Sequence, residues 1–212
     1  IHAGGTIIVD NQYVGGICCL LSNYNNYPTH LLTSGHLFPS SNDKLKVYSG
    51  EYNSTELLHI GDLAVNLLDN YPNNPGFPID IALVELNDNA VDLIVDNGPV
   101  INKFIPAPSI LNKMAQVFFP TTNDYSNYVK IEPHFVEQYS LNSDARGWFT
   151  VRKMIKTEIS ITNPGDSGTI LFVNQNLGAG VCTGGALGLF EPLDRALQAI
   201  SEIENTAYYI WR

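Results

Sequence analysis

The sequence lacks most of the features that mark membrane, fibrous or disulfide-rich proteins. It has three cysteines in 212 residues, too few for a disulfide scaffold. No apolar run approaches the roughly 18 residues that a membrane-spanning helix needs. Neither a heptad pattern nor a repeat of about 20–50 residues is present, which disfavours a coiled coil or a solenoid. Cys18 and Cys19 are adjacent and would point to opposite faces of a strand, so we interpret them and Cys182 as small buried hydrophobes.

Positive charge and metal-binding patterns are also scarce. The chain has 11 Lys and Arg against 21 Asp and Glu, a net charge of −10. Nucleic-acid binding needs clustered Lys and Arg, so we expect no nucleic-acid partner. No CxxC or HxxxH pattern occurs. We therefore expect no metal and no cofactor, and interpret four histidines as structural or surface residues: His2, His30, His59 and His134.

The chain is rich in short runs of Val, Ile, Leu, Thr and Tyr separated by Asn, Asp, Gly, Pro and Ser. This pattern predicts antiparallel β-structure built from hairpins. Turn signals about 8–12 residues apart favour a sandwich or a barrel. The predicted strands are residues 5–9, 14–22, 30–34, 44–49, 57–66, 81–85, 115–119, 128–139, 150–155, 169–173 and 178–183.

Two segments depart from the strand pattern. Residues 96–110 contain three prolines and predict an irregular connection, which we take as the boundary between domains 1–100 and 101–212. The tail has apolar residues at helical spacing, which predicts an amphipathic helix over about 192–204, packed against the last strands. Glu191 and Asp194 lie at its start, where acidic groups suit the helix dipole.

A serine lies between glycines in Gly165-Asp166-Ser167-Gly168, just before a predicted strand. Such a loop can turn the backbone N–H groups of Gly165 and Ser167 toward one point, and paired donors of this kind stabilise an oxyanion. The alternative is an ordinary hairpin loop, because Gly, Asp and Ser are common turn residues.

A base and an acid also occur at strand ends. His36 follows an apolar strand. Imidazole has an ordinary pKa of about 6.5 and is therefore the best match for activating a serine hydroxyl. Asp80 precedes the apolar run 81–84 and needs a buried partner, for which a histidine N–H is suitable. Taken singly, His36 is better interpreted as a structural histidine, and Asp80 is equally well interpreted as a turn residue.

Taken together, these segments resemble the chymotrypsin-like (trypsin-like) serine peptidase family over nearly the whole chain. Thr33-Ser34-Gly35-His36 looks like the motif around the family's base, Asp80-Ile81-Ala82-Leu83 like its acid motif, and Gly165-Asp166-Ser167-Gly168 like its nucleophile motif. The opening Gly4-Gly5-Thr6 and the segment Val14-Gly15-Gly16-Ile17-Cys18-Cys19-Leu20 look more like bacterial or viral members.

The resemblance implies an all-β fold of two antiparallel six-stranded β-barrels with a C-terminal α-helix. It implies a serine endopeptidase that acts through an acyl-enzyme. His36 would be the general base and acid, Asp80 would orient it, and Ser167 would be the nucleophile. The N–H groups of Gly165 and Ser167 would form the oxyanion hole. The first barrel, within 1–100, would carry the base and the acid.

The resemblance also implies a substrate-binding region. Its residues would be Ile161, Thr162, Thr183, Gly184 and Gly185, with substrate added as a strand along Thr183 and Gly185. Trypsin-like members have an Asp six residues before the serine, where this chain has Ile161. Members that cleave after Glu commonly have a His at the position of Cys182. We therefore expect cleavage after apolar or small residues. The Thr183 hydroxyl is also expected to reach Asp80.

Several alternatives stay open at this point. The chain could be a catalytically silent binding module on the same fold, or a peptidase domain cut from a larger protein. An Ile1 ammonium group could pair with Asp166 to hold the oxyanion loop, as in many relatives. We expect a protein or peptide substrate, no membrane span and secretion, with an intracellular viral or effector role as the alternative. The oligomeric state is left open.

Overall fold

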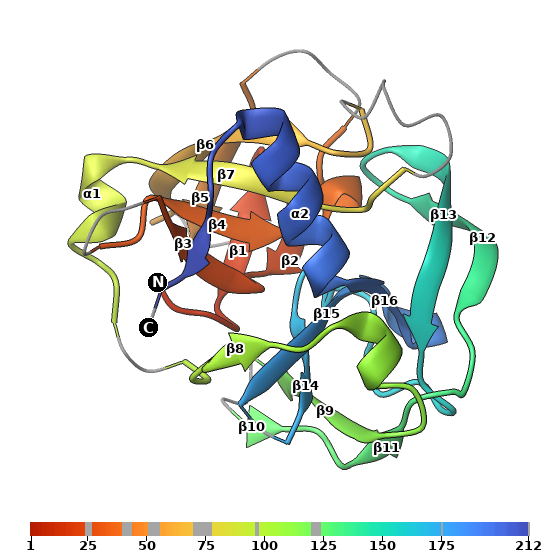
Figure 1. Ribbon diagram of the computed structural model, residues 1–212. Coiled ribbons are helices and arrows are strands. Elements are labelled where there is room, and N and C mark those ends of the chain that lie inside the picture. Colours follow the sequence, from red (N-terminus) through yellow and green to blue (C-terminus); the bar gives the residue numbers. More distant parts are fainter. Residues whose placement is uncertain are drawn as a thin grey trace.

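The computed structural model describes residues 1–23, 27–39, 44–50, 56–69, 78–95, 98–119, 124–174 and 176–211. Two β-sheets make up most of this structure, and a single long helix near the C-terminus lies against them (Figure 1). The predicted all-β fold with a C-terminal helix is therefore confirmed. No helix in these ranges is long and apolar enough to cross a membrane.

The first sheet closes into a barrel because one continuous segment of the chain, which holds β2 and β3, pairs with strands at both ends of the sheet. In the order β17-β3-β4-β7-β6-β5-β1-β2, the end strand β2 and the strand β3 are separated in sequence only by residues 17 and 18. β2 pairs with β1 and β3 pairs with β4, so this continuous segment joins both ends. The bounds are β1 (Thr6–Val9), β2 (Tyr13–Gly16), β3 (Cys19–Ser22), β4 (His30–Thr33), β5 (Lys46–Ser49), β6 (Leu58–Asn66), β7 (Ala82–Leu86) and β17 (Tyr209–Ile210).

The second sheet closes in the same way. Its path is β10-β9-β14-β15-β16-β13-β12, and the segment that holds β11 and β12 pairs with β9 at one end and with β13 at the other. The bounds are β8 (Lys103–Phe104), β9 (Met114–Phe119), β10 (Asp124–Tyr125), β11 (Val129–Lys130), β12 (Val136–Ser143), β13 (Gly147–Lys156), β14 (Ile170–Val173), β15 (Leu177–Gly184) and β16 (Leu189–Pro192).

Two details differ from the prediction. β8 pairs with β15 in parallel, so the second sheet is not wholly antiparallel. The last strand, β17, returns to the first barrel and pairs with β3, although it belongs to the second half of the chain. Within the predicted boundary segment 96–110, residues 96 and 97 lie outside the described residues, and the rest contains β8 and the 3₁₀ turn η2 (Ala107–Ser109).

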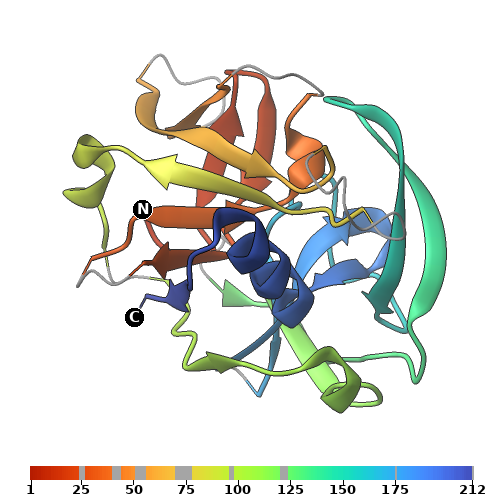
Figure 2. The ribbon, with the colours of Figure 1, turned by 45° about the horizontal axis from the view of Figure 1, so that its top comes forward.

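The predicted helix is α2 (Leu193–Glu204), which ends where Asn205 adopts a left-handed conformation. Its buried residues share one core cluster with residues of both barrels, including Leu32 of β4 and Phe172 of β14. Figure 2 shows α2 lying across the two barrels. The helix therefore joins the barrels rather than packing only on the last strands. The shorter helical elements are α1 (Asp88–Val91), η1 (Gly35–Leu37) and η3 (Gly185–Leu187).

Candidate active site

Three different parts of the chain position His36, Asp80 and Ser167. His36 lies in η1, directly after β4, and Asp80 lies just before β7. Because β4 and β7 pair with Thr33 opposite Ala82, the end of one strand meets the start of the other, and His36 and Asp80 lie side by side. Ser167 comes from the loop before β14, in the second barrel.

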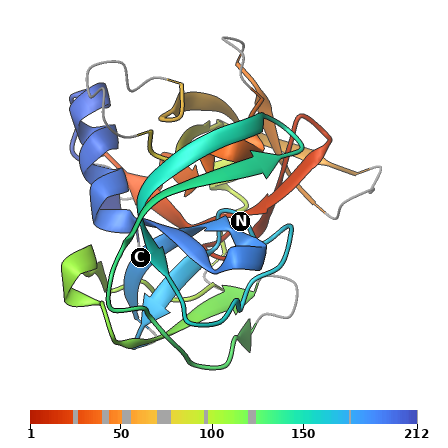
Figure 3. The same cartoon turned by 90° about the vertical axis from the view of Figure 1, so that its right-hand side faces the viewer.

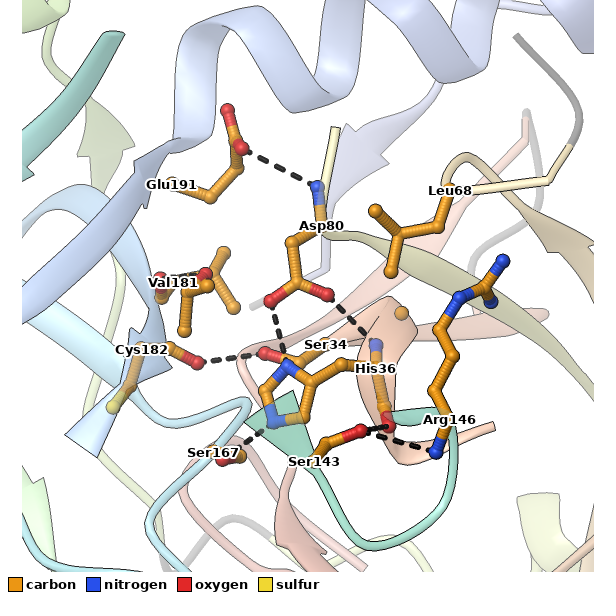
Figure 4. A network of polar contacts seen from close by, with 12 residues as sticks. Ser34, His36, Leu68, Asp80, Ser143, Arg146, Ser167, Val181, Cys182 and Glu191 are labelled. Carbon is orange, nitrogen blue, oxygen red and sulfur yellow. Dashed lines mark hydrogen bonds and ion pairs between the residues drawn. The ribbon is translucent and has the colours of Figure 1, made fainter. Parts of the chain in front are cut away.

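The three side chains form a continuous line of hydrogen bonds (Figure 4). His36 Nδ1 lies 2.7 Å from Asp80 Oδ2, and His36 Nε2 lies 2.8 Å from Ser167 Oγ. The backbone N–H of His36 also donates to Asp80 Oδ1, at 2.7 Å. An ionised carboxylate only accepts, so Nδ1 carries the ring proton and Nε2 can accept the proton of the Ser167 hydroxyl.

The Asp80–His36 part of this line is shielded from solvent. Asp80 is fully buried and His36 is 7% exposed. Burial in a region of low dielectric strengthens hydrogen bonds and makes an unpaired carboxylate costly. The structure therefore brings together the three side chains that the motifs singled out, and gives Asp80 two donors from the same histidine.

The loop around Ser167 has backbone donors to spare. The carbonyl oxygen of Ser167 accepts from Gly16 N, and Gly168 N donates to Cys182 O, which hold the loop against both barrels. Within the described ranges, the backbone N–H groups of Gly165 and Ser167 have no hydrogen-bond partner. Both are therefore unpaired donors in the loop that carries Ser167.

The Asp166 carboxylate turns back on its own loop. It accepts from Asn163 N at 2.7 Å, and burial raises its pKa above the ordinary value. The amino group of Ile1 donates instead to the carbonyl oxygen of Leu93, at 2.7 Å. The Ile1–Asp166 pair that the sequence left open is therefore not formed in this structure.

An open cleft of about 660 Å³ lies beside His36 and Ser167 and is lined by residues of both barrels. Three of the five predicted substrate-binding residues line it: Thr183, Gly184 and Gly185.

The other two predicted substrate-binding residues lie elsewhere. Ile161 packs on the core cluster of the second barrel, and Thr162 is buried with its hydroxyl donating to Gly185 O at 2.5 Å. Thr162 therefore contacts the cleft residue Gly185 without lining the cleft itself. The Thr183 hydroxyl donates to Val181 O at 3.5 Å, rather than to Asp80 as expected.

The β12–β13 hairpin reaches from the second barrel to the first (Figure 3). At its tip the Ser143 hydroxyl donates to the carbonyl oxygen of His36 at 3.1 Å, and Arg146 forms an ion pair with Asp69. The Phe149 ring stacks on the His36 imidazole, with centroids 5.5 Å apart and planes 14° apart. The hairpin therefore covers one face of the imidazole and restricts its movement.

We expect the ion pair between Asp69 and Arg146 to hold the hairpin tip on the first barrel. Replacing Arg146→Met and Asp69→Asn singly and together should give a coupling free energy of about 1 kcal/mol, since Arg146 is mostly buried while Asp69 is partly exposed. Unfolding in urea measures it. Additive single effects would show that the pair does not fasten the hairpin.

Some residues of the site carried no usable signal in the sequence. The Ser34 hydroxyl donates to Cys182 O at 2.6 Å across the barrel boundary, and Glu191 accepts from Asp80 N at 3.3 Å. Ser143 and Phe149 contact a histidine more than 100 positions away. Only pairing of the two barrels defines these contacts. The three cysteines are free and buried, as predicted, and burial raises the pKa of Cys182 to about 12, so its thiol is no nucleophile.

Comparison with solved structures shows where this architecture occurs elsewhere. The chain is similar to Nocardiopsis protease (NAPase), with a TM-score of 0.61 and 16% identity, covering 94% of this chain and 95% of that one. It is also similar to Deg5, with a TM-score of 0.59 and 14% identity, covering 97% and 91%. The chain has the chymotrypsin-like fold. The resemblance drawn from the motifs is confirmed for the fold, and at these identities the likeness carries the fold alone.

Comparison of the sequence with family models and curated proteins assigns no family. No protein-family model matches the chain. Among curated proteins, it is similar to the DNA mismatch repair protein MutS of Borreliella burgdorferi, 30% identical over 88 residues. The chain spans 10% of the length of MutS, and the match covers 38% of this chain. The match to MutS of Borreliella afzelii has the same extent. These matches are too short to assign a family or an activity.

Proposed function

We propose that the protein is a serine endopeptidase that hydrolyses peptide bonds through an acyl-enzyme. The proposal rests chiefly on the hydrogen-bonded line from Ser167 Oγ through the His36 ring to Asp80, at 2.8 and 2.7 Å. A serine hydroxyl is a weak nucleophile unless a base accepts its proton, and this arrangement supplies that base. The fold shared with Nocardiopsis protease is consistent with it.

Acylation begins when Ser167 Oγ attacks the scissile carbonyl carbon and its proton moves to His36 Nε2. Asp80 stabilises the imidazolium that forms, through its contact with Nδ1. The carbonyl oxygen becomes an oxyanion, for which the unpaired N–H groups of Gly165 and Ser167 are the proposed donors. The C–N bond then breaks, and His36 returns the proton to the leaving amine.

Deacylation repeats the same steps with water. His36 Nε2 accepts a proton from water as the water oxygen attacks the ester carbon. The C–O bond to Ser167 then breaks, and the proton returns to Ser167 Oγ. The products are a carboxylic acid and the free enzyme, so no redox partner or cofactor takes part in the proposed reaction.

A protein or peptide in extended form is the proposed substrate. The cleft is open and its lining includes Thr183, Gly184 and Gly185 near the end of β15, whose backbone can pair with an added strand. Its walls include aromatic side chains of the β12–β13 hairpin, of which Trp148 is 76% exposed. Secretion stays a prediction from the sequence.

We predict cleavage after apolar or small residues. The cleft lining includes Leu141, Phe149 and Leu187, and the only ionisable side chains among its described lining residues are those of His36, Asp144 and two tyrosines. A cationic or anionic substrate side chain would lack a buried counter-charge. Profiling a peptide library by mass spectrometry measures this, and a dominant preference for Arg, Lys or Glu before the cut would contradict it.

A fluorophosphonate probe tests the proposed function directly. We expect covalent labelling at Ser167 in the wild type, located by peptide mass spectrometry, and its loss in Ser167→Ala and His36→Ala. Ser109→Ala is a matched control, because Ser109 is exposed in η2 and lies outside the cleft. A folded wild type that is not labelled would favour the alternative, a catalytically silent binding module on this fold.

A further inference from the structure

Glu191 is a buried acid that the steps above do not use. It lies in β16 and is fully buried. Its Oε1 accepts from Arg195 Nε at 2.8 Å. Its Oε2 accepts from the backbone N–H of Asp80 at 3.3 Å (Figure 4). Burial of a carboxylate away from solvent is costly unless hydrogen-bond partners compensate it, and Arg195 and the Asp80 N–H are such partners for Glu191.

The contact with Glu191 involves a backbone N–H of Asp80 that strand pairing leaves without an acceptor. Asp80 precedes β7, so no strand partner accepts from its N–H, and the acceptor that the structure gives this group is Glu191. The Asp80 carboxylate in turn receives both the ring and the backbone N–H of His36. The orientation of Asp80 therefore depends on the two N–H groups of His36 that bind its carboxylate and on Glu191, which binds its backbone N–H.

We propose that Glu191 is a positioning residue whose negative charge holds Asp80 in the orientation that His36 requires, which ties the activity of the site to the ionisation of Glu191. This inference rests on the proposed peptidase function. A charged acceptor binds an N–H more strongly than a neutral one, so the ionised carboxylate fixes Asp80 better than the protonated form.

The surroundings of Glu191 bring its ionisation close to neutral pH. Burial raises the pKa of Glu191 to about 7, and Asp80 adds to the rise, while the Arg195 guanidinium opposes it. Arg195 comes from α2 and also donates to the carbonyl oxygen of Arg152 on β13; β15 presents Val181 opposite Glu191. Among the described residues, Arg195 and Asp80 are the charged groups that shift the pKa of Glu191.

The test compares Glu191→Gln with the wild type across pH. Glutamine keeps an acceptor oxygen for Asp80 N but never carries charge. The ratio of wild-type to variant kcat/KM should be about tenfold well above pH 7 and fall toward one well below it, where Glu191 is protonated too. KM should change little. Glu132→Gln, which removes a half-exposed partner of Lys156, should give a ratio near one throughout.

Two further measurements keep the inference open to disproof. Arg195→Met removes the charge that opposes the raised pKa of Glu191. When Glu191 and Glu191→Gln are compared in the Arg195→Met background, the rise in the kcat/KM ratio should therefore move to higher pH. The proton between His36 Nδ1 and Asp80 should change its NMR resonance in Glu191→Gln and not in Glu132→Gln. A ratio independent of pH with an unmoved resonance overturns the role of Glu191. A wild type with no hydrolysis at any pH overturns the proposed function, and the resonance still decides the role of Glu191.

Discussion

Replacing Asp80→Asn is expected to lower kcat/KM by about 10⁴-fold and leave the protein folded. Asparagine can still accept from the backbone N–H of His36 through Oδ1, which keeps the loop in place. Its NH₂ group, however, would face Nδ1, so Nδ1 becomes the acceptor and Nε2 carries the proton. The ring then has no lone pair for the Ser167 hydroxyl, and acylation loses its base.

Steady-state hydrolysis of a peptide ester and an amide measures this loss, with circular dichroism as the check on folding. Asp62→Asn is the matched control, because Asp62 pairs with His59 on the surface of the first barrel. Its kcat/KM should stay within twofold of the wild type. If Asp80→Asn lost less than tenfold while folded, Asp80 would not fix the tautomer of His36.

The second large effect is expected for Gly168→Ala, as a loss of stability. Gly168 has φ +91°, which residues with a side chain rarely adopt, and a Cβ there would overlap the carbonyl oxygen of Gly16 and the hydroxyl oxygen of Thr33. Strain of this kind typically costs about 1–3 kcal/mol. The overlap with the first barrel adds about 1–3 kcal/mol. Denaturation in guanidinium chloride measures the sum.

Gly165→Ala separates the two contributions. Gly165 has φ +98°, but a Cβ there meets nothing within 4 Å. It should therefore show the backbone strain alone and lose about 1–3 kcal/mol. Equal losses in the two variants would mean that the approach of Gly168 to Gly16 and Thr33 does not limit the substitution.

The sequence located the strands best where apolar runs are bounded by turn residues. Residues 5–9, 57–66 and 178–183 match β1, β6 and β15 to within one residue at each end. It placed a strand at 128–139, whereas the structure interrupts that stretch and continues β12 to Ser143. Leu141 is the only buried residue of β12, so burial imposes little pattern on the residues of that strand. The sequence missed β8, β10 and β17, since two residues form no periodic pattern, and it missed β16, which directly precedes α2.

The sequence by itself determined the all-β fold class, and it singled out the histidine, the aspartate and the serine that the proposed chemistry uses. The tertiary structure alone decided the distances between them, the unpaired N–H groups at Gly165 and Ser167, the stacking of Phe149 and the place of Glu191 behind Asp80. Most of these depend on how the two barrels meet, and contacts between residues 44 to 131 positions apart are set by packing and strand register, which local sequence patterns do not encode.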